Sequence, residues 1–262
     1  MNRILAVAQN TFKEAIRNKV LYALLFFAVA LIAASLAVAK LSLGNELRVI
    51  TDLGLAAVSL FSVVIAVFIG VNLVYKELER KTIYQLLSKP LRRHEFIAGR
   101  YLGTVATMAL LMAFMILFFV GMILLQNGTV RAALCKALWL SFVEVSVISA
   151  VALFFSSFSS PFLSGLFTLL AFATGRLTPQ IHQLLDQFEQ GIGVSLVRVF
   201  VATLPDCHLF TVSGAVVGNQ WMSIHGQFVT WRYVAQATAY GLLYSLVVLV
   251  LAALIFRRRD LV

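Results

Sequence analysis

Long apolar runs alternate along the chain with short stretches that hold most of the charged residues. A helix needs about 20 predominantly apolar residues to cross a hydrocarbon core that is about 30 Å thick. The runs that meet this requirement are residues 20–39, 53–74, 101–125, 137–155 and 233–256. The pattern therefore predicts an all-α membrane protein in which these runs span the bilayer.

A sixth apolar run, residues 161–174, is short for a span and begins with proline. Proline is well tolerated in the first turn of a helix. We predict that this run also crosses by borrowing residues 157–160 or 175–177, which gives six transmembrane helices. The alternative is a re-entrant hairpin formed with the preceding span. In either case residues 1–262 are expected to form a single transmembrane domain.

The composition supports a membrane protein and excludes a soluble one. Hydrophobic residues make up 61% of the chain and charged residues 12%, and the mean hydropathy is +0.95. A soluble domain has about 25% charged residues. The net charge of +10 does not indicate a nucleic-acid partner, because the basic residues lie between the apolar runs.

The distribution of Lys and Arg predicts the orientation. With six spans, twice as many of the 21 Lys and Arg residues lie on the side of the N-terminus as on the other side. Cytoplasmic loops carry an excess of these residues. We therefore expect a multi-pass protein of the cell (inner) membrane with both termini in the cytoplasm.

Residues 2–19 are predicted to form an amphipathic helix before the first span. Its apolar stripe repeats every four residues and consists of Ile4, Ala8, Phe12 and Ile16. Such a helix can lie in the headgroup layer with its apolar face toward lipid and its basic residues near anionic headgroups. Membrane lipid is therefore an expected partner. The alternative is an ordinary cytoplasmic start to the first span.

Residues 75–100, called the elbow below, are too charged to cross the membrane and too regular for an unstructured loop. One helical face of this segment holds Leu78, Thr82, Ile83, Leu86 and Leu87. Pro90 is expected to end that helix, since the residue before proline disfavours the α region, and a second helix then restarts at Leu91. An exposed apolar stripe at the cytoplasmic side requires a partner surface or the lipid interface.

Residues 176–232 form a long segment that we expect on the outer side, as a small external lid of helices. Residues 180–190 have helical spacing, and residues 191–204 are apolar but too short to span, which favours an interfacial or re-entrant position. Pro205 and Asp206 then predict a turn.

The motifs of common enzymes are absent from the sequence. It contains no G-x-x-x-x-G-K-S/T phosphate loop and no H-E-x-x-H zinc motif, and its four histidines are scattered among loops. No metal site, cofactor or catalytic residue is therefore expected. An intramembrane serine protease is disfavoured, because no histidine lies within a span.

Glu144 is the one carboxylate inside a predicted span. An ionised acid at this depth costs about 2.5–3.5 kcal/mol on insertion scales. Glu144 is therefore expected to be protonated, to be paired, or to face a polar path between helices. One interpretation is a group that lines a substrate pathway or a gate. The other is a hydrogen bond that holds helices together, with Ser or Thr as the partner.

The two cysteines, Cys135 and Cys207, both lie on the outer side in this topology. In an oxidising compartment they could form one disulfide. The sequence does not fix their separation, so pairing stays open.

The elbow resembles the corresponding stretch of type-2 ABC transporter permeases, in particular the NosY-like branch. The matching positions are Glu77, Glu79, Thr82, Leu86, Leu87, Ser88, Pro90, Arg93, Glu95, Phe96 and Gly99. Lys81 stands where the family commonly has glycine, and Arg100 where it commonly has lysine. The basic N-terminal helix, the long segment after the fifth span and Leu204-Pro205-Asp206 also resemble this family.

The resemblance implies the permease subunit of an exporter that dimerises with a second, identical or related protomer. A separate ABC-type ATPase would bind ATP and dock on the elbow. The implied ATPase-coupling residues are Glu77, Glu79, Thr82, Leu86, Leu87, Pro90 and Arg93, and the N-terminal helix would steer the first span. The alternative is a membrane scaffold that is coupled to the same kind of ATPase and moves no substrate. Nothing in the sequence identifies the cargo.

Overall fold

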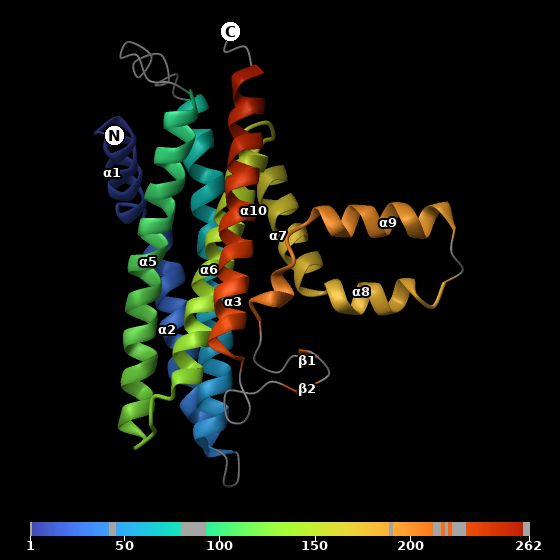
Figure 1. The fold of residues 1–262 in the computed structure, drawn as a ribbon. Coiled ribbons are helices and arrows are strands. Elements are labelled where there is room, and N and C mark those ends of the chain that lie inside the picture. Colours follow the sequence, from blue (N-terminus) through green and yellow to red (C-terminus); the bar gives the residue numbers. More distant parts are fainter. Residues whose placement is uncertain are drawn as a thin grey trace.

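The protein forms a bundle of long, nearly parallel helices in a computed structural model (Figure 1). The structure describes residues 2–41, 46–79, 93–188, 191–211, 216–217, 220–221 and 229–258. The bundle helices are α1 (Asn2–Ile16), α2 (Lys19–Lys40), α3 (Glu46–Glu79), α5 (Arg93–Leu125), α6 (Ala132–Ser156), α7 (Pro161–Arg176) and α10 (Trp231–Arg258). The shorter elements are α8 (Thr178–Leu185), α9 (Ile192–Thr203), the 3₁₀ turn η1 (Cys207–Leu209) and the paired antiparallel strands β1 (Val216–Val217) and β2 (Gln220–Trp221). The predicted all-α membrane fold is confirmed, with this two-residue strand pair as its one addition in the described residues.

Five helices, α2, α3, α5, α6 and α10, are long and apolar enough to cross a membrane. They coincide with the five long apolar runs of the sequence. Helix α7 has 16 residues, which corresponds to about 24 Å and falls short of a hydrocarbon core of about 30 Å. The count of six crossings therefore stays a prediction.

Helices α3 and α6 form the centre of the bundle. In each of them, 72% of the candidate span is buried, against 22% in α2 and in α10. The outer helices instead expose apolar side chains such as Phe26 and Leu242. A helix that is hydrophobic on all sides is stable in a packed core or in a membrane. Helices α3 and α6 correspond to the first case, and α2 and α10 to the second.

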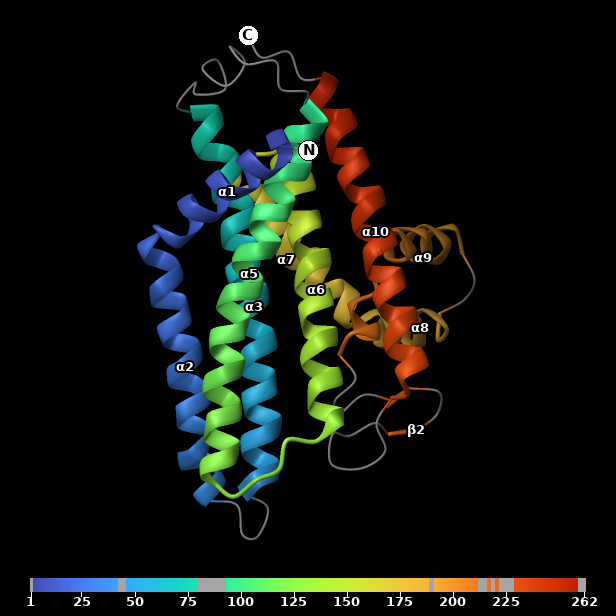
Figure 2. The same ribbon diagram turned by 60° about the vertical axis from the view of Figure 1, so that its left-hand side comes forward.

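The start of the first helix and the end of the last helix lie at one end of the bundle. Figure 2 shows the start of α1, the end of α3, the start of α5 and the end of α10 together there. The predicted placement of both termini on the same side thus agrees with the fold, while the assignment of that side to the cytoplasm stays a prediction. The elbow joins α3 to α5 at this end, and its residues 80–92 lie outside the described residues.

The predicted N-terminal helix is present as α1, and one face of it packs on the first turns of α5. Gly99 and Gly103 allow the two backbones to approach closely. A Cβ added at Gly99 would lie 2.7 Å from the Cβ of Val7, and one at Gly103 would lie 2.6 Å from the carbonyl oxygen of Ala8. Thr11 of α1 is buried in this contact. Lipid contact by the rest of α1 stays a prediction.

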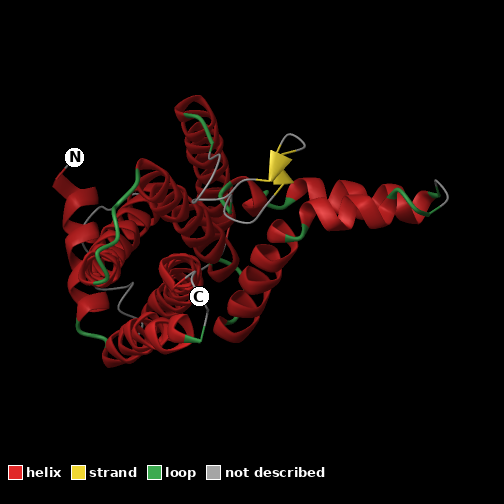
Figure 3. Ribbon diagram, turned by 90° about the horizontal axis from the view of Figure 1, so that it is seen from below, coloured by secondary structure: helices red, strands yellow, loops and turns green. Residues whose placement is uncertain are grey.

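Helices α8 and α9 form an arm (residues 178–203) that projects sideways from the bundle at intermediate height (Figure 1). The view along the bundle in Figure 3 shows the same projection to one side. In this single copy, the arm stands beside the bundle and covers neither of its ends. The outward location of residues 176–232 stays a prediction.

Candidate functional site

A buried ion pair lies at the centre of the bundle. Arg176 ends α7, and its Nε and Nη2 atoms each donate a hydrogen bond to the carboxylate of Glu144 on α6, both at 3.1 Å. The Nη2 atom also donates to the hydroxyl of Ser59 on α3 at 2.6 Å, and that hydroxyl lies 3.3 Å from Glu144 Oε2. The guanidinium group therefore binds the carboxylate in a bidentate manner, the geometry in which arginine binds carboxylates most strongly. Together with Ser59, this contact joins α3, α6 and α7.

The pair lies deep in the apolar part of the molecule. Glu144 is half-way along the 25 residues of α6, so it is about 18 Å from either end of that helix. Its side chain is 1% exposed, whereas that of Arg176 is 29% exposed. The ring of Phe172 covers part of the guanidinium group, with its centroid 4.8 Å from Cζ. Intramembrane ion pairs of this kind are rare and mark candidate functional sites.

A tight turn after α9 closes the site from the side of α7. Gly175 is required there, because a Cβ would lie 2.2 Å from the carbonyl oxygen of Pro205 and 3.0 Å from the Sγ of Cys207. The Asp206 side chain accepts a hydrogen bond from the His208 backbone N–H at 3.2 Å. The Thr211 hydroxyl, just beyond the turn, donates to the carbonyl oxygen of Cys207 at 3.5 Å.

Burial also changes the acid–base behaviour of this turn. Loss of water raises the pKa of the Cys207 thiol well above its usual range, and the negative charge of Glu144 adds to that rise. Burial likewise raises the pKa of the Asp206 carboxyl, against a smaller opposing effect of its hydrogen bond from His208. Cys207 is therefore held as a neutral, inert thiol, as expected for a structural buried cysteine.

Three tyrosines on one face of α10 hold the same turn in place. The Tyr233 hydroxyl donates to the carbonyl oxygen of Leu209 at 2.9 Å, and the Tyr244 hydroxyl donates to that of Thr203 at 3.1 Å. The Tyr240 hydroxyl accepts from the backbone N–H of Asp206 at 3.1 Å. The last span is thereby connected through the turn to the ion pair.

Polar groups continue along the interface of α3, α6 and α7 toward the end that carries the elbow. The Ser156 hydroxyl on α6 donates to the carbonyl oxygen of Gly70 on α3 at 3.3 Å. The hydroxyls of Ser62 and Ser164 are buried and have no hydrogen-bond partner in the described part of the chain. A buried hydroxyl without a partner carries a desolvation cost.

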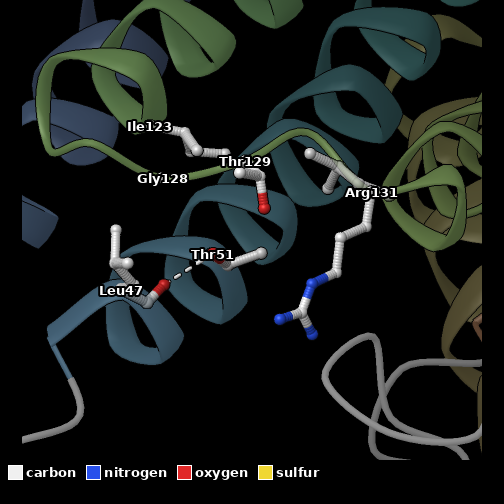
Figure 4. Close-up of a pocket in the computed structure, with 7 residues that line it drawn as sticks. Leu47, Thr51, Ile123, Gly128, Thr129 and Arg131 are labelled. Atoms are coloured by element: carbon white, nitrogen blue, oxygen red, sulfur yellow. Dashed lines mark hydrogen bonds between the residues drawn. The ribbon is translucent and has the colours of Figure 1, made fainter.

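A pocket lies at the opposite end of the bundle from the elbow (Figure 4). Its lining residues are Leu47, Thr51, Ile123, Gly128, Thr129, Arg131 and Leu134. The Thr51 hydroxyl is already used, since it donates to the carbonyl oxygen of Leu47 at 2.6 Å. The other polar side chains of its lining are those of Thr129 and Arg131.

Both interpretations of Glu144 left open by the sequence retain support. Ser59 does bind it from a neighbouring helix, as the packing interpretation required, but the main partner is Arg176. Ser141 and Ser149 of α6 instead donate to backbone carbonyl groups of their own helix. The pathway or gate role of Glu144 stays a prediction.

Arg176 is the residue that the sequence interpretation missed, because it was counted with the outer segment. A signal for it was available. The one carboxylate within a span and the arginine that ends the shortest apolar run carry complementary charges, and charged groups inside a membrane usually pair with one another.

The predicted ATPase-coupling residues divide between described and undescribed parts of the chain. Glu77 and Glu79 lie in the last turn of α3, and Arg93 begins α5. The others, Thr82, Leu86, Leu87 and Pro90, lie outside the described residues. Their role in coupling stays a prediction.

The possible Cys135–Cys207 disulfide is not formed, and both cysteines are free. Cys135 is exposed near the start of α6. Cys207 is buried near Glu144. On α6, Glu144 lies nine residues, or about 13 Å, beyond Cys135. The described residues contain no group of three or more His, Cys, Asp or Glu side chains that could hold a metal ion.

Comparison with known proteins gives the family of the chain. No curated protein matches it. The model of the family described as ABC-2 family transporter protein matches residues 5–261, which include the ion pair and all of the bundle helices except the first three residues of α1. The chain therefore belongs to the ABC-2 family of transporter proteins and is the membrane-spanning permease of an ABC transporter.

Proposed function

We propose that this permease is an exporter subunit driven by a separate ABC-type ATPase that docks on the elbow. The sequence has no phosphate loop, so ATP binding and hydrolysis are assigned to the partner and the permease itself is not an enzyme. The proposed assembly contains two permease protomers, identical or related, in the cell (inner) membrane. The ends of α1, α3, α5 and α10 that lie together are assigned to the cytoplasm.

The observation that carries this proposal is the close packing of α1 on α5 directly after the elbow. Helix α5 begins at Arg93, and Gly99 and Gly103 seat α1 on its next turns. Only Arg17 and Asn18 separate α1 from α2. A displacement of the elbow is therefore passed to α5 directly and to α2 through α1, as in the small helix shifts of other switching proteins.

Charged groups reinforce this contact. Arg100 of α5 is 1% exposed, and Glu14 of α1 lies within electrostatic reach of it. Its guanidinium group also lies 5.1 Å from the centroid of the Phe96 ring. The ring contact lies within α5 and the attraction to Glu14 crosses to α1, so the charge of Arg100 favours the packing of the two helices.

The ion pair is the proposed control point for transport. It joins α3, α6 and α7. Tyr240 of α10 accepts a hydrogen bond from Asp206 in the turn after α9, which packs against Gly175 beside the ion pair. ATP can drive the permease only through unequal stability of two arrangements of these helices. We assign Glu144 and Arg176 to the gate that differs between them.

The ATPase contact can be tested by substitution within the elbow. Leu86→Asp with Leu87→Asp is expected to abolish co-purification of the ATPase while leaving the permease in the membrane, since charge disrupts an apolar docking stripe. The matched control is Leu41→Asp with Leu125→Asp, two exposed leucines at the opposite end of the bundle. Retained co-purification of the elbow variant would refute the docking site.

A transport assay separates the exporter from the scaffold alternative. With both subunits in vesicles, an exporter hydrolyses ATP faster in the presence of its cargo and accumulates that cargo on one side. Glu144→Gln is then expected to reduce export more than ATPase binding. ATP hydrolysis that no cargo stimulates, in a complex that still drives an external partner process, would favour the scaffold.

A further inference from the structure

The guanidinium group of Arg176 has two N–H donors that the ion pair does not use. Arginine carries five such donors in a fixed planar fork. The Nε donor and one Nη2 donor bind the carboxylate of Glu144, and the second Nη2 donor binds Ser59. The two donors of Nη1 have no partner in the described part of the chain, and Nη1 is not buried. Since the side chain is 29% exposed, this Nη1 edge is the accessible side of the pair.

The Nη1 edge lies deep in the membrane-spanning part of the molecule. Arg176 is bonded to Glu144, which is half-way along the 25 residues of α6. That helix is about 37 Å long, so a hydrocarbon layer of about 30 Å anywhere along it encloses its midpoint by about 10 Å or more. Unsatisfied N–H donors are unfavourable at this depth. The Nη1 donors therefore require an acceptor that the described residues do not supply.

The charges at the ion pair determine which kind of acceptor fits. The positive charge of Arg176 is already balanced by the carboxylate of Glu144, to which it is bonded on the opposite edge. A second anion on the same guanidinium group would be repelled by Glu144 and would leave a net negative charge within the membrane, which is unfavourable. A neutral oxygen atom, in a carbonyl or hydroxyl group, accepts the same hydrogen bonds without this repulsion.

Apolar side chains lie beside the accessible edge. The ring of Phe172 covers one face of the guanidinium group, with its centroid 4.8 Å from Cζ. Leu177 follows Arg176 in the chain and is 51% exposed, and Leu60 follows Ser59 and is 49% exposed. A ligand that reaches Nη1 therefore meets an apolar surface together with two hydrogen-bond donors.

We propose that the Nη1 edge of Arg176 donates hydrogen bonds to a neutral oxygen acceptor of the cargo, and that the cargo is an uncharged amphiphile. The inference rests on the proposed function, because it assumes that the permease moves a cargo past the ion pair. Glu144 has a further role in this arrangement. It orients the guanidinium group and balances its charge, so that the free edge binds neutral groups in preference to anions.

The test is photo-crosslinking of the full-length permease in phosphatidylcholine nanodiscs, without the ATPase. Three probes carry a diazirine at the same carbon of the same alkyl chain. They are a diacylglycerol, which is neutral and has oxygen acceptors, the corresponding phosphatidic acid, which adds an anionic group, and a hydrocarbon without oxygen. We expect the diacylglycerol to label the segments around Leu60 and Leu177 several-fold more than either of the other probes does.

The variant Arg176→Lys keeps a positive charge for Glu144 but removes Nη1. It is expected to lower labelling by the diacylglycerol several-fold, to the level of the hydrocarbon probe. The matched control is Arg198→Lys, the same substitution in α9, which should leave the labelling unchanged. Where Arg176→Lys does not fold, the comparison of the three probes on the unaltered permease still decides the question.

Three results would overturn the proposal. Equal labelling by the diacylglycerol and the hydrocarbon would show that Nη1 does not recognise an oxygen acceptor. Stronger labelling by the phosphatidic acid would show that the site selects anions. Absence of labelling by all three probes would show that water or a second protein copy occupies the edge. Because no ATPase is present, any of these results leaves the exporter proposal standing, and a failure of ATPase docking leaves the crosslinking result standing.

Discussion

The bundle interior and the α8–α9 arm each contain an arginine–carboxylate pair, and these two pairs are almost equally short. The Arg176–Glu144 distance is 3.1 Å and the Arg198–Asp186 distance is 3.0 Å. Their surroundings differ, since the first carboxylate is 1% exposed and the second 69%. The distance between the charged atoms of an ion pair therefore says little about its contribution to stability. That contribution depends on how far the pair is buried away from water.

The same two regions differ in how their glycines are used. Gly175 in the bundle is in contact with the backbone of the turn at Pro205, whereas Gly193 in the arm has nothing within 4 Å of an added Cβ. Close approach of two backbones fixes the position of a helix, and the arm has this contact only at its base. The arm is therefore fixed to the bundle only at its base.

The largest expected effect comes from Arg176→Gln, because it leaves the buried carboxylate of Glu144 without its main partner. Removing one member of a buried pair costs about 3–5 kcal/mol. A marked fall in the melting temperature of the purified permease is expected. The double variant Glu144→Gln with Arg176→Gln should recover much of the loss, since no unpaired charge remains. Equal stability of Arg176→Gln and the unaltered protein would contradict the burial of the pair.

The next largest effect on the free energy of unfolding is expected from Gly175→Ala, and Gly193→Ala is its matched control. The first places a methyl group against backbone atoms that cannot move aside, and overpacking of this kind costs about 1–3 kcal/mol. The second removes the helix penalty of glycine in open space and should leave stability unchanged or raise it by up to about 1 kcal/mol. Thermal unfolding of the two variants side by side provides the measurement. A destabilised Gly193→Ala would show that the arm is packed against something.

The smallest expected effect belongs to Arg198→Gln, and its size sharpens the comparison most. An exposed pair contributes about 0.2–1 kcal/mol, and loss of the Arg198–Asp186 pair is expected to cost no more than that. The control is Arg48→Gln, which breaks an exposed pair with Asp52 at 3.8 Å. Arg198→Gln should lower the unfolding temperature about as little as Arg48→Gln and far less than Arg176→Gln. A loss as large as that of Arg176→Gln would contradict the comparison.

The sequence predicted those features that depend on local pattern. The five long spans follow from apolar length, and α7 begins at Pro161 as expected. The one carboxylate within a span, Glu144, was identified because a charge in an apolar run needs a partner. These inferences require only residues that are close together in the chain.

Features that depend on long-range contacts were not predicted. Ser59 and Arg176 meet Glu144 from 85 and 32 residues away, and no periodicity specifies which helix supplies a partner. The sideways direction of the arm depends on the contact between Gly175 and Pro205. The close packing of α1 on α5 depends on Gly99 and Gly103, and the apolar pattern of the sequence does not indicate that these glycines contact another helix.

The most direct test of the central claim, that a separate ATPase drives this permease through the elbow, is the side of the membrane on which the elbow lies. Lys89→Cys in a Cys135→Ser background can be treated with a membrane-impermeant maleimide, in sealed cells and in inverted vesicles. The account predicts labelling in inverted vesicles and none in intact cells. Labelling in intact cells would place the elbow outside, where no cytoplasmic ATPase can reach it, and would contradict the account.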